Sequence, residues 1–192
     1  MNIGLTGGLG CGKSTALAFF REAGAVTVDT DALVHDFLRS DEELITELRE
    51  AFGDEILDAQ GMIDRSKLAR KVFNNSEALA LLESLVHPRV RSVWMRKLGE
   101  SHPVLVVEIP LLFEKELQEN FSLTVCLSCD PEVQHKRLKA KGMSNSQIQQ
   151  RKLRQLSLDD KMRRADIILY NNGSLEHLRE QVGHVMRQTC EH

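Results

Sequence analysis

The chain has 192 residues, a length that favours one compact domain with subdomains over two independent domains. Its 42% hydrophobic and 28% charged content is typical of a globular protein, and a formal net charge of −3 gives no electrostatic support for bulk binding to nucleic acid or membranes. No apolar run approaches the roughly 18 residues of a membrane span, and no signal-type segment precedes the first predicted strand. We therefore expect a cytoplasmic location.

That first strand, residues 2–6, runs directly into a glycine-rich loop, residues 7–14, with the P-loop spacing G-x4-G-K-S. Glycines let the backbone approach an anion closely, and the helix expected after the loop adds its positive end. In this pattern Lys13 reaches the β- and γ-phosphates, and the Ser14 hydroxyl ligates Mg²⁺. We expect ATP or GTP to bind at Gly8, Leu9, Gly10, Cys11, Gly12, Lys13, Ser14 and Thr15.

The four cysteines do not complete a zinc site. Cys126 and Cys129 form a lone C-x2-C at the end of an apolar run, without a second pair or a histidine partner, which favours two reduced thiols closing a buried strand. Cys11 lies inside the phosphate loop, where a helix N-terminus lowers a thiol pKa. We therefore hypothesise that its oxidation or alkylation blocks nucleotide binding.

A second strand, residues 25–28, ends in Asp29-Thr30-Asp31, so two carboxylates leave the edge of the sheet at which ligands bind in open α/β folds. Asp31 is suited to accept a proton from a hydroxyl that attacks phosphorus, or to cap the next helix, or both.

Residues 32–100 have helical periodicity, and roughly 70 such residues between two strands are too many for a simple crossover. We predict an inserted helical subdomain. Within it we expect a capping box that opens at Ser40, a helix that carries Phe73 and breaks at residues 74–76, and an interruption at His87-Pro88 with Pro88 in the first turn of a new helix.

Three further strands are expected at residues 104–109, 121–127 and 165–170. Pro110 ends the first of them, whose carboxylate Glu108 is placed like a Walker B acid that holds the Mg²⁺ water shell. Asp130 and Pro131 begin one helix and Ser174 caps the last. The fold class is therefore α/β, with a five-stranded parallel sheet flanked by helices.

Residues 131–165 hold ten lysines and arginines against three acids, and a helix begins within them at Ser144. Two interpretations are open: a solvated basic face, or a mobile basic flap that closes over polyphosphate and excludes water.

These motifs together resemble those of the dephospho-coenzyme A kinases over nearly the whole chain. The segments that carry the resemblance are residues 4–14, 28–31, 86–88, 108–114, 134–138, 164–166 and 171–173, with Gln155 and Lys161. The P-loop alone is shared by very many NTPases, whereas the Asp-x-Asp, His-Pro and Glu-x-Pro-Leu-Leu-Phe-Glu set in this order is far more specific.

The resemblance implies ATP-dependent phosphorylation of the ribose 3′-hydroxyl of dephospho-CoA, the last step of coenzyme A biosynthesis, with Mg²⁺. It implies a nucleotide-kinase core of residues 1–31, 101–136 and 165–192, a helical substrate domain of residues 32–100, and a basic lid of residues 137–164. The expected partner is the small-molecule substrate, with no nucleic acid and no membrane, and the protein is expected to be a monomer or a small homo-oligomer.

The resemblance also assigns site residues. Asp31, Lys13 and Arg137 would be catalytic, and Ser14 would bind the metal. We expect Asn172 near the adenine. Substrate contacts would come from Asp31, His87, Pro88, Glu108 and Leu111, although a His before Pro is also a common structural turn. Lys141 replaces an arginine common in the family and lacks its bidentate fork, so Arg137, Lys141, Arg151 and Arg154 remain open as the cation on the transferred phosphoryl.

The alternatives are another P-loop small-molecule or nucleotide kinase, and a GTPase or motor-type NTPase. The sequence contains neither the N-K-x-D guanine motif nor the Gly-rich signature of an ABC-type protein.

Overall fold

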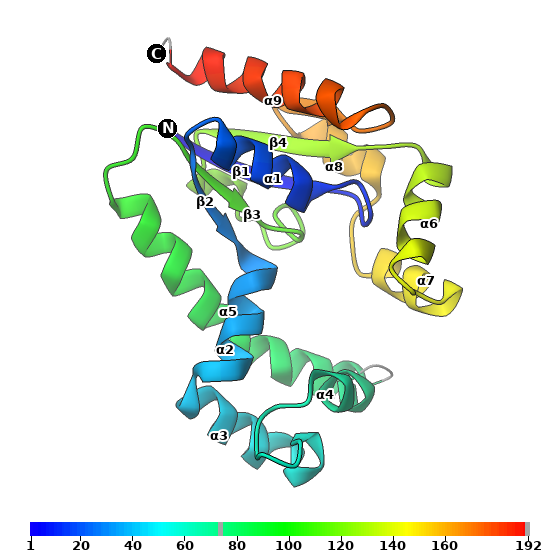
Figure 1. Ribbon diagram of the computed structural model, residues 1–192. Coiled ribbons are helices and arrows are strands. Elements are labelled where there is room, and N and C mark those ends of the chain that lie inside the picture. Colours follow the sequence, from blue (N-terminus) through cyan, green and yellow to red (C-terminus); the bar gives the residue numbers. More distant parts are fainter. Residues whose placement is uncertain (73–74, 191–192) are drawn as a thin grey trace. The chain divides into compact units, whose positions relative to one another are not determined.

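The computed structural model describes residues 1–72 and 75–190 of the chain, which divides into two compact units (Figure 1). The first unit comprises Met1–Asp29 with Glu100–His192, and the second comprises Thr30–Gly99. Phe73 and Asn74, where we predicted the end of one helix, lie outside the described residues. The separate lid of residues 137–164 stays a prediction.

The first unit is built on a parallel sheet in which β1 occupies the centre. Its strands within the described residues are β1 (Asn2–Gly7), β2 (Val26–Asp29), β3 (Leu105–Glu108), β4 (Leu123–Ser128) and β5 (Ile167–Tyr170). Their order is β2-β3-β1-β4-β5, and every neighbouring pair is parallel. The predicted fold class is confirmed, with strand boundaries within two residues of those expected from the sequence.

Alternation along β1 separates the two faces of the sheet. Ile3 and Leu5 are fully buried in a core shared with α1 (Lys13–Glu22) and α9 (Leu175–Cys190), which pack together over one face (Figure 1). Gly4 and Thr6 point to the opposite face, because successive strand residues alternate. There the Thr6 hydroxyl donates to the Pro110 carbonyl across 3.3 Å.

The remaining elements of this unit follow β3 and β4. They are the 3₁₀ helix η2 (Gln118–Asn120), α6 (Pro131–Ala140), α7 (Asn145–Leu153) and α8 (Leu158–Arg164). Ser144 caps α7 in a complete capping box with Gln147, as predicted. Asp130 is the N-cap residue of α6 with Pro131 in the first turn, as predicted, although its side chain makes no capping hydrogen bond. The Asp130 carboxylate instead accepts from Asn172 Nδ2 at 3.0 Å.

The second unit is helical throughout its described secondary structure. It contains α2 (Thr30–Ser40), α3 (Glu42–Phe52), the 3₁₀ helix η1 (Asp54–Ile56), α4 (Arg65–Val72) and α5 (Ser76–Gly99), and an isolated bridge joins Leu57 and Ile63. Among the described residues, no helix combines the length and apolarity that a membrane crossing requires.

Two local predictions in this unit are wrong. The cap of α3 is Asp41, whose carboxylate accepts from Leu44 N at 3.0 Å. Ser40 belongs to the end of α2, where its hydroxyl donates to the Asp36 carbonyl. Pro88 does not start a helix but lies inside the continuous α5. Next to it the Arg89 guanidinium donates to the Leu85 carbonyl at 3.0 Å and to the Glu47 carboxylate on α3.

Candidate active site

The loop between β1 and α1 has a conformation that requires glycine at two of its positions. Gly7 has φ of 147°, and a Cβ atom added there would lie 2.4 Å from the Leu127 carbonyl oxygen. Gly12 has φ of 92°, and its added Cβ would lie 2.3 Å from Asn171 Nδ2. Both φ values lie in the region that residues with a side chain rarely adopt. The sequence spacing G-x4-G-K-S therefore corresponds to a compact, tightly packed loop.

The amino end of α1 is open to an anion. Its N-cap residue is Gly12, which supplies no side chain to cap the first turn. Lys13 folds back over the loop, with Nζ 3.4 Å from the Gly7 carbonyl oxygen and 3.3 Å from that of Gly8, and Ser14 is exposed beside it. Main-chain N–H groups, an ammonium and a hydroxyl thus meet at one helix terminus, as polyphosphate binding requires.

Arg137, at the start of the basic segment (residues 131–165), lies beside this loop. It belongs to α6, its Nη2 donates to Asn171 Oδ1 at 3.3 Å, and its Nη1 is 4.0 Å from the position of a Cβ on Gly12. Nη1 is buried and has no hydrogen-bond partner in the described part of the chain. A buried guanidinium nitrogen next to the loop can donate to a phosphate oxygen.

The Cys11 side chain points into the protein. It is fully buried, with Sγ 3.5 Å from Cys129 Sγ and 3.2 Å from Gln134 Nε2. Burial raises the pKa of the Cys129 thiol to about 12, with a smaller contribution from Cys11, and burial likewise raises that of Cys126 to about 12. The described cysteines at 11, 126 and 129 are free thiols. The proposed Cys11 contact with nucleotide can therefore only come from its main chain in this conformation.

Two carboxylates stand side by side at the carboxyl edge of the sheet. Asp29 on β2 is in register with Glu108 on β3, and Glu108 is in register with Leu5 on β1. Partners in a parallel ladder share a face, so both carboxylates lie on the face covered by α1. Glu108 is 3% exposed. This places acidic oxygens on the strands next to the phosphate loop, as a Walker B acid requires.

The proposed general base and the His-Pro motif belong to the second unit. Asp31 is exposed in the first turn of α2, and His87 and Pro88 are exposed on α5. Because α2 begins at Thr30, Asp31 lies within its first turn and is not its N-cap residue, so the alternative that Asp31 caps the helix is wrong. An acidic side chain in a first turn still interacts favourably with the helix dipole. The catalytic role of Asp31 stays a prediction.

The other predicted cations and contacts lie at several places in the first unit. Lys141 follows α6 and is exposed, as are Arg151 on α7 and Arg154 just after it. Leu111 is half-buried in the loop after β3. Asn172 is exposed and accepts from Asp130 N at 2.7 Å through Oδ1, so its described contacts stabilise the turn after β5.

Sequence reasoning assigned no individual role to two buried polar residues of this region, Asn171 and Lys161. Asn171 Nδ2 donates to the Cys11 carbonyl at 2.8 Å. Lys161 on α8 is fully buried and pairs with Glu114 at 2.9 Å. Asn171 and Lys161 stood in the motifs that we quoted, but a lysine or asparagine reveals its burial only through partners that are distant in sequence.

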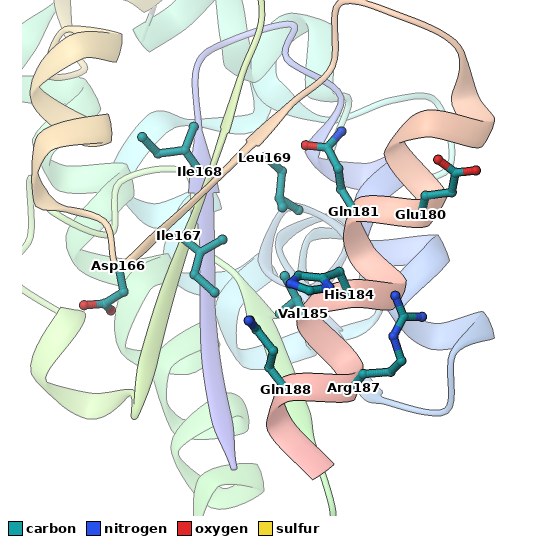
Figure 2. A pocket seen from close by; sticks show the side chains of 10 residues that line it. All are labelled: Asp166, Ile167, Ile168, Leu169, Glu180, Gln181, His184, Val185, Arg187 and Gln188. Atoms are coloured by element: carbon teal, nitrogen blue, oxygen red, sulfur yellow. The ribbon is translucent and has the colours of Figure 1, made fainter. Parts of the chain in front are cut away.

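A separate groove of about 670 Å³ lies between β5 and α9. Figure 2 shows Ile167 and Leu169 from the strand facing His184 and Val185 from the helix. None of its lining residues belongs to the P-loop, so this groove is not the phosphate site.

The residues near the loop suit Mg²⁺. An exposed Ser14 hydroxyl next to Lys13 and carboxylates at the neighbouring strand ends are hard oxygen donors of the kind that this ion prefers. Among the described residues no cluster of three or more His, Cys, Asp or Glu side chains could hold a metal by itself.

A parallel sheet with a central P-loop strand, an open helix terminus and a buried arginine nitrogen beside it is the arrangement of a P-loop nucleotide-binding protein. A solved structure shares the fold. A shikimate kinase from Acinetobacter baumannii aligns with a TM-score of 0.55 over 99% of this chain and 93% of its own, at 16% identity, which shows the fold alone.

The chain belongs to the dephospho-CoA kinase family. The family model CoaE, "Dephospho-CoA kinase", matches residues 1–177. A dephospho-CoA kinase from Corynebacterium glutamicum is 35% identical over 98% of this chain and 96% of its own length, and one from Aquifex aeolicus is 36% identical over 97% and 96%. A solved dephospho-CoA kinase from Campylobacter jejuni aligns with a TM-score of 0.66 at 25% identity, over 100% of this chain and 98% of its own.

Proposed function

We propose that the protein transfers the γ-phosphoryl group of ATP to the 3′-hydroxyl of the ribose of dephospho-CoA, giving CoA and ADP. The observation that carries the proposal is the P-loop with its open helix terminus, in a chain that belongs to the dephospho-CoA kinase family along nearly all of its length. In the reaction the 3′-oxygen forms a bond to the γ-phosphorus, and the bond from that phosphorus to the β–γ bridging oxygen breaks.

The protein's work in such a transfer is mainly positioning and charge stabilisation. The main-chain N–H groups around Gly12 would hold the phosphates. Lys13 would exchange its hydrogen bonds to the loop carbonyls for contacts with β- and γ-phosphate oxygens. The buried Nη1 of Arg137 would donate a hydrogen bond to an oxygen of the same triphosphate. Arg151 and Arg154 on the basic segment remain candidates for a further contact, together with Lys141.

Asp31 would orient the 3′-hydroxyl and take its proton as the oxygen attacks. The family resemblance assigns His87, Pro88, Glu108 and Leu111 to the substrate. The exposure of Asp31, His87 and Pro88 supports a role in binding, because each is accessible to a ligand.

Ser14 would hold Mg²⁺, with Asp29 or Glu108 acting through its water shell. When bound, the ion supplies neutralisation of the β- and γ-phosphate charge. A cytoplasmic location and a monomeric or small oligomeric state stay predictions from the sequence.

The test is purified protein with ATP and Mg²⁺, incubated with dephospho-CoA and, in parallel, with AMP, CMP, shikimate or pantothenate. We expect ADP to form with dephospho-CoA and CoA to appear in equal amount by mass spectrometry. ADP formation with another acceptor of the panel, or at the same rate without any acceptor, would contradict the proposal.

A further inference from the structure

Lys161 on α8 is a fully buried lysine in the first unit. It lies on the sheet face opposite α1, since it binds the same Pro110 carbonyl as Thr6, at 2.6 Å from Nζ. Its ammonium pairs with Glu114 Oε1 at 2.9 Å, and the exposure of the two side chains is 0% and 12%. Removing a lysine from water is costly unless a carboxylate and hydrogen bonds compensate, so this position must depend on both partners.

The phosphate loop is close enough to affect this lysine. Burial lowers the pKa of Lys161, the Glu114 carboxylate opposes that effect, and the charge of Lys13 lowers the pKa further. Lys161 lies on α8 and Glu114 in the segment after β3, and α8 also reaches the loop directly, since Leu158 Cδ1 lies 3.4 Å from the position of a Cβ on Gly8.

Glu114 also binds the main chain at the end of the basic segment. Its Oε1 accepts from Leu156 N at 2.8 Å, two residues before α8 begins. One carboxylate thus fixes residue 156 through its N–H group and residue 161 through its ammonium. The turn between α7 and α8, where the chain returns from the basic helix to the core, is attached to the loop after β3 by these contacts.

The basic segment therefore has two attachments in the same unit. At its start, Arg137 binds Asn171 beside the P-loop. At its end, Lys161 and Leu156 bind Glu114. The exposed Arg151, Lys152 and Arg154 lie on the stretch between these two points. If such a segment closes over phosphates, its lysine and arginine side chains reach a defined position only when both ends of the segment are fixed.

We propose that Glu114 and Lys161 are positioning residues for phosphoryl transfer, which hold the return end of the basic segment so that its cations reach the phosphates. This inference rests on the proposed kinase function. The competing interpretation is that the buried pair only stabilises the fold.

The decisive variant replaces both partners, Glu114→Leu with Lys161→Met, because exchanging a buried ion pair for apolar side chains is often neutral for stability. Glu114→Gln is the second variant, since glutamine keeps an acceptor for Leu156 N and removes only the charge. The matched control is Arg163→Ala on the same helix, whose exposed guanidinium pairs with Asp160.

Two readouts separate positioning from stability: steady-state kinetics with dephospho-CoA, and trypsin cleavage after Arg151, Lys152 and Arg154 with and without a non-hydrolysable ATP analogue. We expect the analogue to slow cleavage in the wild type and in Arg163→Ala, but not in the double variant. We expect kcat of the double variant to fall by about 10- to 100-fold, with the Kd for the analogue within about threefold. Glu114→Gln should change in the same direction.

Folded variants with wild-type kcat and wild-type protection from trypsin by the analogue would overturn the inference. A lower melting temperature without a change in either readout would overturn it as well. If the double variant does not fold, the same two readouts on Glu114→Gln decide. A wild type that makes no CoA refutes the proposed function instead, and the trypsin comparison, which needs no acceptor, still decides whether the pair fixes the segment over bound nucleotide.

Discussion

Asn171 Nδ2 donates a 2.8 Å hydrogen bond to the main-chain carbonyl of Cys11, a residue 160 positions earlier in the chain. Through Oδ1 the same amide accepts from Arg137 Nη2 at 3.3 Å. One buried side chain therefore connects the phosphate loop, α6 and the end of β5. It fits against Gly12 so closely that the loop tolerates no side chain there.

We predict that Gly12→Ala abolishes nucleotide binding, because the added methyl group would lie 2.3 Å from Asn171 Nδ2 at a φ of 92°. The Kd for a fluorescent ATP analogue should rise by at least about 100-fold, equivalent to about 2.7 kcal/mol. Gly173→Ala is the matched control, since no atom lies within 4 Å of its added Cβ. Wild-type affinity in Gly12→Ala would show that the loop adapts.

Asp31→Asn should reduce kcat by about 10²–10⁴-fold, because asparagine can orient the acceptor hydroxyl but cannot take its proton. ATP affinity should change little. Asp36→Asn, on the same helix and also exposed, should leave both constants unchanged. The measurement is steady-state kinetics with dephospho-CoA, and a kcat within a few-fold of wild type would remove Asp31 from the role of base.

The buried thiols give a prediction that depends on pH. With a pKa of about 12 for Cys126 and Cys129, only about one thiol in 10⁴ is ionised at pH 8. Iodoacetamide should therefore leave both unmodified in the native protein and label both in denaturant, as mass spectrometry can follow. Rapid native labelling of either thiol would contradict this.

The same shift affects stability. Because the folded-state pKa lies above the ordinary 9.0, the stabilisation is complete below pH 9 and is lost as the pH rises towards about 12. Urea unfolding should show a smaller loss of stability over this range in a Cys126→Ala, Cys129→Ala variant than in the wild type. An equal loss would mean that these thiols do not titrate as we infer.

In the second unit, Arg89 holds α5 to α3. Its guanidinium donates to both carboxylate oxygens of Glu47, at 3.1 and 2.9 Å, and lies 3.3 Å from Asp41, with a side-chain exposure of 21%. Arg89→Met should lower the free energy of unfolding by about 1–3 kcal/mol. Arg39→Ala, which breaks an exposed pair with Asp36, should change it by less than about 0.5 kcal/mol. Equal effects in urea titrations would contradict this ranking.

The sheet and the phosphate loop could be predicted from the sequence, because both depend on local signals. Short apolar runs mark buried strands, and the glycines, Lys13 and Ser14 lie within eight consecutive residues. The helix α8 was not predicted. It has only seven residues, and the one that is fully buried is a lysine, Lys161. Hydrophobic periodicity cannot detect such a helix.

Other features of the structure depend on contacts between residues that are distant in sequence, which a local rule does not include. A proline often occupies the first turn of a helix. Pro88 nevertheless lies inside α5, next to Arg89, which binds Glu47 on another helix. Cys11 lies in the phosphate loop, as its place in the motif indicated, and its side chain is turned towards Cys129, 118 positions away. The two asparagines after β5 differ in their distant partners. Asn171 binds the Cys11 carbonyl in the phosphate loop, whereas Asn172 binds Asp130 before α6.

The central place of β1 also affects how the chain matures during synthesis. This strand precedes the other described strands of the sheet in the chain, but its neighbours are β3 and β4, with Asn2 opposite Leu105 and Gly7 opposite Leu127. Domains generally fold as units from the N-terminus during translation, and pairing across such a sequence separation is slow. The helices of the second unit, made in between, have their contacts available earlier. The nascent nucleotide pocket is therefore among the last parts of the enzyme to form, and ATP can stabilise the chain only late in its translation.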